Sequence, residues 1–182
     1  MTNIQYLALL RGINVGGNNT IRMADLKTCF EDMGFTDVVT YIQSGNVIFK
    51  SAGQDKAKLT QIIESRLSVR YNYTPKIVLT TYNHIEAVVR KAPGTFGLKP
   101  DEFRYDVVFL KEPMTPEEAI QSVRTREGID QAYTGQGVLY FSKLISKAGQ
   151  SCLNKIISLP VYQYMTIRNW NTTTKLLELM NK

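Results

Sequence analysis

The sequence is poor in the residues that most often carry metal, redox or disulfide chemistry. Its 182 residues include two cysteines, one histidine and one tryptophan. Two cysteines cannot supply a disulfide framework, and a lone histidine without a Cys/His/Asp cluster does not match the spacing of a zinc site. We therefore predict no metal ion and no cofactor, two cysteines buried as small apolar side chains, and a reducing, cytoplasmic location.

Long apolar runs are also missing. The longest, such as Leu7–Leu10, extend to about five residues, whereas a membrane-spanning helix needs about 20. The first residues lack the charged segment and cleavage site of a signal peptide. We therefore expect no membrane insertion. Because 43% of the residues are hydrophobic and 21% are charged, the composition predicts a globular chain rather than a disordered one.

Acidic residues are fewer than basic ones. The 16 Asp and Glu residues stand against 22 Lys and Arg residues, for a net charge of +6. Such a balance favours acidic partners, for example nucleic acid or phosphorylated metabolites. The excess is concentrated late in the chain, but no run of consecutive Lys or Arg exceeds two residues, so no basic tail is predicted.

The apolar periodicity follows the same order of elements twice. In the first half it predicts strands at 5–10, 38–42, 47–50 and 76–80, with helices around 26–33, 59–67 and 81–91. In the second half it predicts strands at 105–110, 128–133, 138–141 and 161–167, with helices after Thr115, around 153–157 and at 173–180. A stretch rich in Pro and Gly, 92–100, separates the halves.

This repeated βαββαβ order predicts an α+β fold of two tandem ferredoxin-like units, each with an antiparallel sheet packed against helices. We expect residues 1–91 to form the first unit with a connecting helix and 92–100 to form a linker. Residues 101–182 would then form the second unit with a C-terminal helix.

Three polar segments stand out against this scaffold. The first, 11–19, leaves the first strand and precedes a helix, and it is rich in Gly and Asn. Backbone N–H groups in such a loop can cradle an anion, with Arg11 and Arg22 on either side. The segment is neither a Walker loop nor a GxGxxG fingerprint. A long loop that needs Gly for tight turns would look the same.

The second segment, 40–46, contains a hairpin turn, which we expect at the opposite strand ends from the first loop. The third, 168–175, lies where the last strand passes into the last helix. Asn169 or Asn171 would cap that helix while Trp170 packs inward with Thr173 and Leu177. Alternatively, Arg168 and Lys175 would hold an anion beside Trp170 as a stacking face.

Together these segments resemble the signature of a bacterial family known as domain of unknown function 1697. The matching stretches are Leu9-Leu10-Arg11-Gly12-Ile13-Asn14-Val15-Gly16-Gly17, Thr40-Tyr41-Ile42-Gln43-Ser44-Gly45-Asn46-Val47-Ile48-Phe49, and Arg168-Asn169-Trp170-Asn171-Thr172 with Lys175-Leu176. The resemblance covers nearly the whole chain. It implies tandem ferredoxin-like subdomains and carries no established activity or catalytic residues. The chain departs from the family at Ala92-Pro93-Gly94, where an Asn-Pro-Phe-like turn is usual.

Our preferred hypothesis is a cytosolic binding module for an anionic, phosphate-bearing small molecule or nucleotide, with the three segments facing one cleft. The candidate ligand-binding residues are Arg11, Asn14, Gly16, Gly17, Asn18, Arg22, Gln43, Ser44, Asn46, Arg168, Asn169, Trp170, Asn171 and Lys175.

Three alternatives stay open. The first is binding of RNA or single-stranded DNA on exposed aromatics of the sheets, although no RNP-type run is present. The second is a small phosphatase-like hydrolase in which Arg11 holds phosphate and Asn14 or Asn46 orients water. In the third, the segments are purely structural and satisfy buried backbone groups. The sequence does not decide whether the protein is an enzyme, nor its catalytic residues or oligomeric state.

Overall fold

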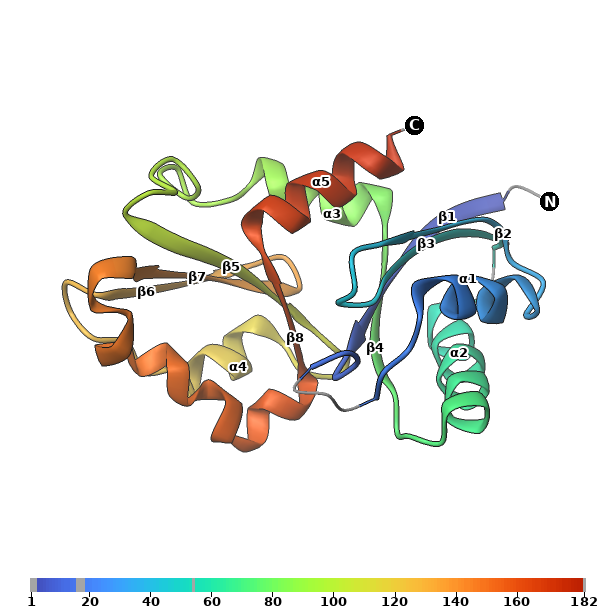
Figure 1. Cartoon of the computed structure of the whole chain (residues 1–182). Helices are drawn as coiled ribbons and strands as arrows, with labels where there is room; N and C mark the ends of the chain where they lie inside the picture. The colour runs from blue at the N-terminus through green and yellow to red at the C-terminus, as the bar shows by residue number, and fades with distance from the viewer. Residues whose placement is uncertain (1–2, 16–18, 54, 182) are drawn as a thin grey trace. The chain divides into compact units, whose positions relative to one another are not determined.

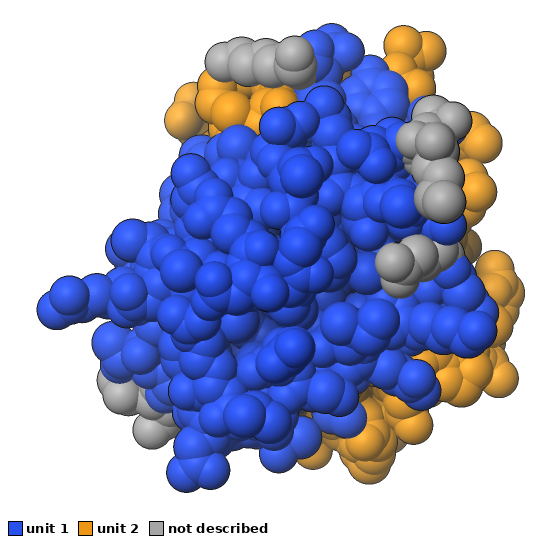
Figure 2. Space-filling view, turned by 90° about the vertical axis from the view of Figure 1, so that its right-hand side faces the viewer, with its two compact units in different colours: residues 1–83, 180–182 blue, residues 84–179 orange. Residues whose placement is uncertain are grey.

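The computed structural model describes residues 3–15, 19–53 and 55–181. The chain divides into two compact units (Figure 2). Unit 1 consists of residues 1–83 with 180–182, and unit 2 consists of residues 84–179. Each unit contains one four-stranded antiparallel sheet, and this confirms the predicted α+β fold of two tandem ferredoxin-like units.

In unit 1 the sheet has the strand order β2-β3-β1-β4, with helices α1 and α2 on one of its sides (Figure 1). The elements are β1 (Asn3–Arg11), α1 (Met23–Glu31), β2 (Thr36–Tyr41), β3 (Asn46–Ala52), α2 (Lys56–Tyr71) and β4 (Lys76–Thr81). Their order is the βαββαβ order expected from the periodicity of the sequence.

Local sequence sets the ends of these helices. Asp55 caps α2, because its side chain accepts a hydrogen bond from the Ala57 backbone N–H at 2.8 Å. Asn72 closes the same helix in the left-handed conformation. After α1, Gly34 has a φ of +84°, so it forms the predicted turn at the C-terminal end of that helix.

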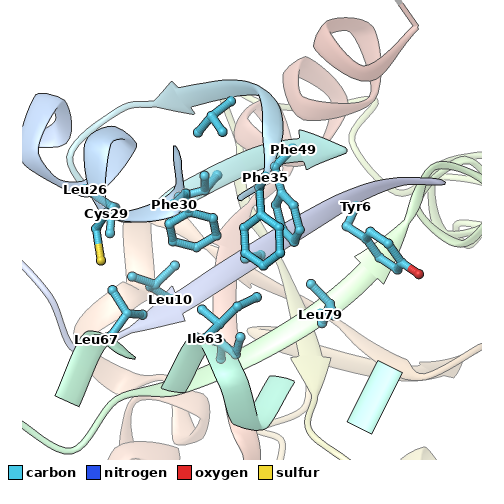
Figure 3. Packing of buried hydrophobic residues seen from close by; sticks show 14 of the residues in the cluster. Tyr6, Leu10, Leu26, Cys29, Phe30, Phe35, Phe49, Ile63, Leu67 and Leu79 are labelled. Carbon is cyan, nitrogen blue, oxygen red and sulfur yellow. The ribbon is translucent and has the colours of Figure 1, made fainter. Parts of the chain in front are cut away.

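The core of unit 1 lies between the sheet and its two helices. The rings of Phe30, Phe35 and Phe49 pack against one another, with centroids 4.5–5.9 Å apart (Figure 3). From α2, Ile63 and Leu67 close this cluster and are fully buried. Apart from Phe35, which lies between α1 and β2, these residues lie on helices and strands that the apolar periodicity predicts.

Unit 2 has the equivalent strand order, β6-β7-β5-β8. Its strands are β5 (Phe103–Leu110), β6 (Asp130–Gly135), β7 (Val138–Leu144) and β8 (Met165–Asn169). Helix α4 (Pro116–Gln121) begins with the predicted capping box, in which Thr115 and Glu118 bond each other's backbone N–H groups. Two more helices, α3 (Tyr82–Arg90) and α5 (Trp170–Met180), precede and follow these elements.

The predicted helix around 153–157 is present as a 3-10 helix rather than an α-helix, and its predicted buried face is wrong at Ile157. The predicted start of the last strand at Val161 is also wrong. Three 3-10 segments fill this region: η1 (Ile145–Gln150), η2 (Cys152–Ser158) and η3 (Pro160–Tyr164). Together with α4 they lie on one side of the unit 2 sheet (Figure 1). Because a 3-10 turn has three residues, Leu153 and Ile156 share a buried side, whereas Ile157 turns outward and is 66% exposed.

The division into compact units differs from the expected linker at 92–100. It falls inside α3, between Asn83 and His84. The rest of α3 is held to the unit 2 sheet, since the Tyr140 hydroxyl donates to the Val88 carbonyl at 2.7 Å. In addition, His84 Nε2 lies 2.7 Å from the Gln136 carbonyl oxygen.

Candidate functional site

The first two polar segments meet within unit 1. The Leu10 backbone N–H donates to the Gly45 carbonyl at 2.8 Å, and Asn14 Nδ2 donates to the Gln43 carbonyl at 2.8 Å. A side chain at position 45 would collide with Ile13 and Leu10, so this close approach requires glycine. We call residues 11–15, 19–22 and 42–46 the N-terminal cluster.

This contact corrects the expectation that the hairpin turn lies at the opposite strand ends from the first loop. Strands β1 and β3 are antiparallel neighbours, and their register pairs Leu9 with Asn46. The end of β1 therefore meets the beginning of β3, where the hairpin turn is located. The expectation overlooked that β3, rather than β2, is the neighbour of β1.

Asn14 organises the N-terminal cluster. Its Nδ2 donates to the carbonyls of Ile21, at 3.0 Å, and Gln43, at 2.8 Å, while its Oδ1 accepts from the Ile21 N–H at 2.8 Å. Its backbone has a φ of +54°, a conformation that Asn tolerates better than most residues. Both amide hydrogens are thus directed at backbone groups, so the side chain holds the loop in shape.

The other described asparagines of the cluster act in the same way. Asn19 Nδ2 donates to the Gly12 carbonyl at 2.9 Å. Asn46 is buried and donates to the Tyr41 carbonyl and to Ser44 Oγ, at 2.9 and 3.1 Å. Three further candidates, Gly16, Gly17 and Asn18, lie outside the described residues.

Basic side chains border the N-terminal cluster. The register of β1 and β4 places Arg11 directly opposite Lys76. Arg22 is exposed and immediately precedes α1, and no side chain in the described part of the chain caps that helix. The sequence contains no acidic residue in 11–22 or 42–46. Of the remaining candidates in the cluster, Gln43 is exposed and Ser44 is half-buried.

The third segment, in unit 2, starts helix α5. Asn169 Oδ1 accepts from the Asn171 backbone N–H at 3.0 Å, and Asn169 Nδ2 donates to the Tyr105 carbonyl at 3.1 Å. Asn169 therefore caps α5 and ties it to β5, which confirms the capping alternative for this residue. The Asn171 side chain lies at the surface.

Trp170 belongs to an aromatic cluster in unit 2. Its ring meets Phe96 edge-on, with centroids 5.2 Å apart, and Phe96 also packs on Tyr105 and Tyr140. A side chain at Gly97 would collide with the Trp170 indole. The 92–100 stretch thus packs against the sheet of unit 2, where it covers Tyr105 and Tyr140.

The two basic candidates of the third segment differ in environment. Arg168 is only 7% exposed and donates from Nη1 to the Ile167 carbonyl at 2.9 Å. Burial lowers the pKa of its guanidinium to about 10, so it is still a cation at neutral pH. Lys175 is exposed and forms an ion pair with Glu178 at 2.8 Å. The convergence of this segment with the N-terminal cluster stays a prediction.

Two grooves beside η2, among the grooves of unit 2, were not predicted from the sequence. One, of 480 Å³, lies between the end of α4 and η2, and its lining includes Arg124, Cys152 and Lys155. The other, of 350 Å³, lies between η2 and the sheet, and its lining includes Asp106 and Lys143. Both depend on the 3-10 geometry of η2, for which the sequence carries no simple periodic signal.

The described residues contain neither a helix long and apolar enough to cross a membrane nor a group of three or more His, Cys, Asp or Glu side chains arranged to hold a metal ion. Cys29 is buried and Cys152 is partly buried, and both are free thiols. Burial raises the pKa of the Cys29 thiol, so it is not activated as a nucleophile.

The strand orders and helices define an α+β protein made of two tandem ferredoxin-like units. Residues 3–140 match the DUF1697 family of proteins of unknown function, and the chain belongs to this family. Among solved structures, it is similar to the conserved bacterial protein SP0830 from Streptococcus pneumoniae, at 28% identity and a TM-score of 0.85. That similarity covers 98% of this chain and 99% of the other. No curated protein matches the sequence.

Proposed function

We propose that the protein is a cytoplasmic binding module for a phosphate-bearing small molecule or nucleotide, with the N-terminal cluster as its site. The pairing of Arg11 with Lys76 across β1 and β4 is the observation that carries this proposal. Directly opposed side chains of a strand pair lie on the same face, and like charges in that arrangement repel. A bound anion would relieve this repulsion.

The start of α1 supports the same ligand class. The first N–H groups of a helix have no partner within the helix and carry partial positive charge. Here no described side chain caps them, and Arg22 lies beside them. Phosphate oxygens are suitable acceptors for such groups. The absence of carboxylates from 11–22 and 42–46 leaves nothing in these segments to repel an anion.

The hydrogen bonds of the cluster favour binding over hydrolysis. A phosphatase-like reaction would use Asn14 or Asn46 to orient water, but the structure directs both amide groups at protein atoms. Nucleic acid is also the weaker choice, because Phe96 packs on Tyr105 and Tyr140, two aromatics of one face of the unit 2 sheet. The two free thiols support a reducing, cytoplasmic location.

Thermal unfolding in the presence of inorganic phosphate, pyrophosphate, nucleotides and sugar phosphates tests the proposal. A ligand at 1,000 times its dissociation constant stabilises the folded state by about 4 kcal/mol. We expect Lys76→Ala and Arg11→Ala to reduce the shift caused by the best ligand. The matched control is Lys58→Ala, which removes an exposed lysine of α2 and hence the same charge. No shift with any phosphate compound, or equal shifts in Lys76→Ala and Lys58→Ala, would overturn the proposal.

A purely structural role is the second candidate, and the three hydrogen bonds of Asn14 favour it specifically. We expect Asn14→Ala to lower the free energy of unfolding by about 2–3 kcal/mol, since it removes three bonds of about 1 kcal/mol each. The two roles are separable by experiment. If Asn14→Ala destabilises the protein while no phosphate ligand shifts the wild type, the segments serve the fold alone.

A further inference from the structure

The smaller of the two grooves beside η2 has the composition of a ligand site. It measures 350 Å³, within the range of small-molecule pockets, and we call it the β5–η2 groove. Its apolar wall includes Phe141, Leu153, Ile156 and Ile167, and its charged residues include Asp106 and Lys143. A mostly apolar lining with a few placed charges is typical of sites that orient a small molecule.

Asp106 has a carboxylate oxygen that lacks a hydrogen bond. The residue is 9% exposed, and its Oδ2 accepts from Arg104 Nε at 2.9 Å. Its Oδ1 is buried and has no hydrogen-bond partner among the residues that the structure describes. Buried polar atoms almost always have a partner, so this oxygen calls for a donor from outside the described chain. Because Asp106 lines the groove, a ligand bound there is the natural source of that donor.

The Lys143 ammonium lies diagonally across the strand pair from the Asp106 carboxylate. The register of β5 and β7 pairs Asp106 with Phe141 and Arg104 with Lys143, so Asp106 and Lys143 are diagonal neighbours on one face of the sheet. The Lys143 ammonium carries three donors, one of which is directed at Asn154 Oδ1 at 2.8 Å. The groove therefore presents a buried acceptor and a cationic donor side by side.

The apolar wall comes from the segment that departs from the predicted helix. Leu153 and Ile156 are buried, and Ile157 lines the same groove with its side chain turned outward. An exposed isoleucine at the rim adds apolar surface that a ligand would remove from water. The groove is therefore suited to a ligand with an aliphatic body.

We propose that the β5–η2 groove binds a free α-amino acid with an aliphatic side chain. The ammonium of the ligand donates to Asp106 Oδ1, its carboxylate accepts from Lys143, and its side chain packs against Ile156 and Ile157. Arg104 also lines the groove and is engaged with Asp106 Oδ2. A zwitterion complements the remaining Asp106 Oδ1 and the Lys143 ammonium, which an acid or an amine alone does not. The site uses no residue of the N-terminal cluster, so it is independent of the function proposed above.

Calorimetric titration of the full chain with L-leucine tests this site. The matched probes are 4-methylpentanoate, which lacks the ammonium, 3-methylbutylamine, which lacks the carboxylate, and glycine, which lacks the side chain. We expect leucine to bind at least about 10-fold more tightly than each probe, because hydrogen bonds to charged groups and buried methyl groups each contribute that much. Absence of leucine binding, or equal binding of 4-methylpentanoate, would overturn the proposal.

Three variants locate the binding. Asp106→Asn and Lys143→Met should each weaken leucine binding by about 10-fold or more. Lys147→Met removes the same charge from η1, outside the groove, and should bind leucine like the wild type. If Asp106→Asn does not fold, as judged by circular dichroism, Ile157→Ser replaces it, since this exposed position tolerates a polar residue and should still lose several-fold in affinity. Wild-type affinity in the folded groove variants would contradict the assignment.

Discussion

Units 1 and 2 share one sheet topology but differ in what covers it. At the second helical position of the βαββαβ order, unit 1 has α2, a continuous helix of 16 residues. Unit 2 has the segments η1, η2 and η3 at the same position. In both sheets, nevertheless, the first strand of the unit lies between the third and the fourth, and the second strand lies at the edge beside the third. The strand order therefore does not depend on a regular helix at this position.

The sequences explain the difference. The α2 segment contains no Gly or Pro and has a capping residue at each end, Asp55 and Asn72. Residues 145–164 contain Gly149 and Pro160, which disfavour a continuous helix. A buried carboxylate fixes the alternative path, because Asp130 accepts hydrogen bonds from Ser151 Oγ and the Cys152 N–H, at 2.6 and 2.8 Å.

The consequence is a difference in how tightly the two cores are closed. In α2, Leu59, Ile63 and Leu67 are fully buried. In η2, Leu153 lines both of the grooves beside this segment. A regular helix thus seals one unit, while the 3-10 segments leave open space beside the core of the other. Five predictions test this comparison.

We expect the largest effect on the free energy of unfolding from a matched pair of leucine-to-alanine substitutions, one in each unit. Leu67→Ala removes a fully buried side chain and leaves a closed cavity, so we expect a loss of about 4 kcal/mol in the free energy of unfolding. Leu153→Ala opens into existing grooves and should cost only about 2 kcal/mol, mainly the transfer term. Urea unfolding measures both values. Equal losses would show that the unit 2 core is sealed as tightly as that of unit 1.

The next effect concerns the start of the covering segment in each unit. Asp130→Ala removes the acceptor of three hydrogen bonds, including one from the Arg126 N–H, and should cost about 3 kcal/mol. Asp55→Ala removes the single capping bond of α2 and should cost about 1 kcal/mol. Both losses are read from urea unfolding. If Asp55→Ala proves the more damaging, the path of the 3-10 segments does not depend on Asp130.

The apolar periodicity was sufficient for most of the fold but not for this region. It predicted all eight strands, although it began the last one at Val161 instead of Met165, and it predicted the capping box at Thr115, because strand alternation and capping are local signals. It failed at 145–164, where spacing of three and spacing of four residues are hard to separate over one or two turns. The tertiary bonds of Asp130 decide the outcome there, and they join residues 21 and 22 positions apart.

The candidate site divides along similar lines. The sequence identified the polar segments of the N-terminal cluster, but their asparagines are hydrogen-bonded to protein groups. The Asn and Gly residues correctly indicated a loop of defined conformation. Residue type alone does not show whether an asparagine side chain donates to the protein backbone or to a ligand. The β5–η2 groove was missed because Asp106 and Lys143 are 37 positions apart and meet only through the register of β5 and β7.

A smaller difference in the free energy of unfolding is expected between two Tyr→Phe substitutions, one in each unit, that remove a buried hydroxyl. Tyr140→Phe removes the bond to the Val88 carbonyl in unit 2 and should cost about 1 kcal/mol. Tyr73→Phe in unit 1 removes a buried hydroxyl that has no partner among the described residues, so it should be neutral or stabilising. Urea unfolding of both variants measures the difference. A loss of 1 kcal/mol or so in Tyr73→Phe would mean that its hydroxyl is satisfied in solution.

The tyrosine of unit 2 also makes a prediction for alkaline pH. Burial raises the pKa of Tyr140 to about 12, above its ordinary value near 10. Since the folded state holds the neutral phenol, its contribution to stability is complete below about pH 10 and is lost as the pH rises towards 12. Ultraviolet titration of the wild type against Tyr140→Phe isolates this phenol. A difference spectrum that titrates near 10 would contradict its burial.

The smallest effect concerns the capping box that both the sequence and the structure place at the start of α4. Backbone and hydroxyl hydrogen bonds from Thr115 lower the pKa of the Glu118 carboxyl below its ordinary value. A lowered pKa in the folded state stabilises the protein above the unfolded pKa, and this contribution disappears as the pH falls through the folded value. The stability difference between the wild type and Glu118→Gln should therefore shrink on acidification from neutral pH to below about pH 4. Because Glu118 is exposed, the change is small and needs low ionic strength to be resolved. A difference that stays constant with pH would mean that the charge of Glu118 does not stabilise α4, and that this short helix is held by packing alone.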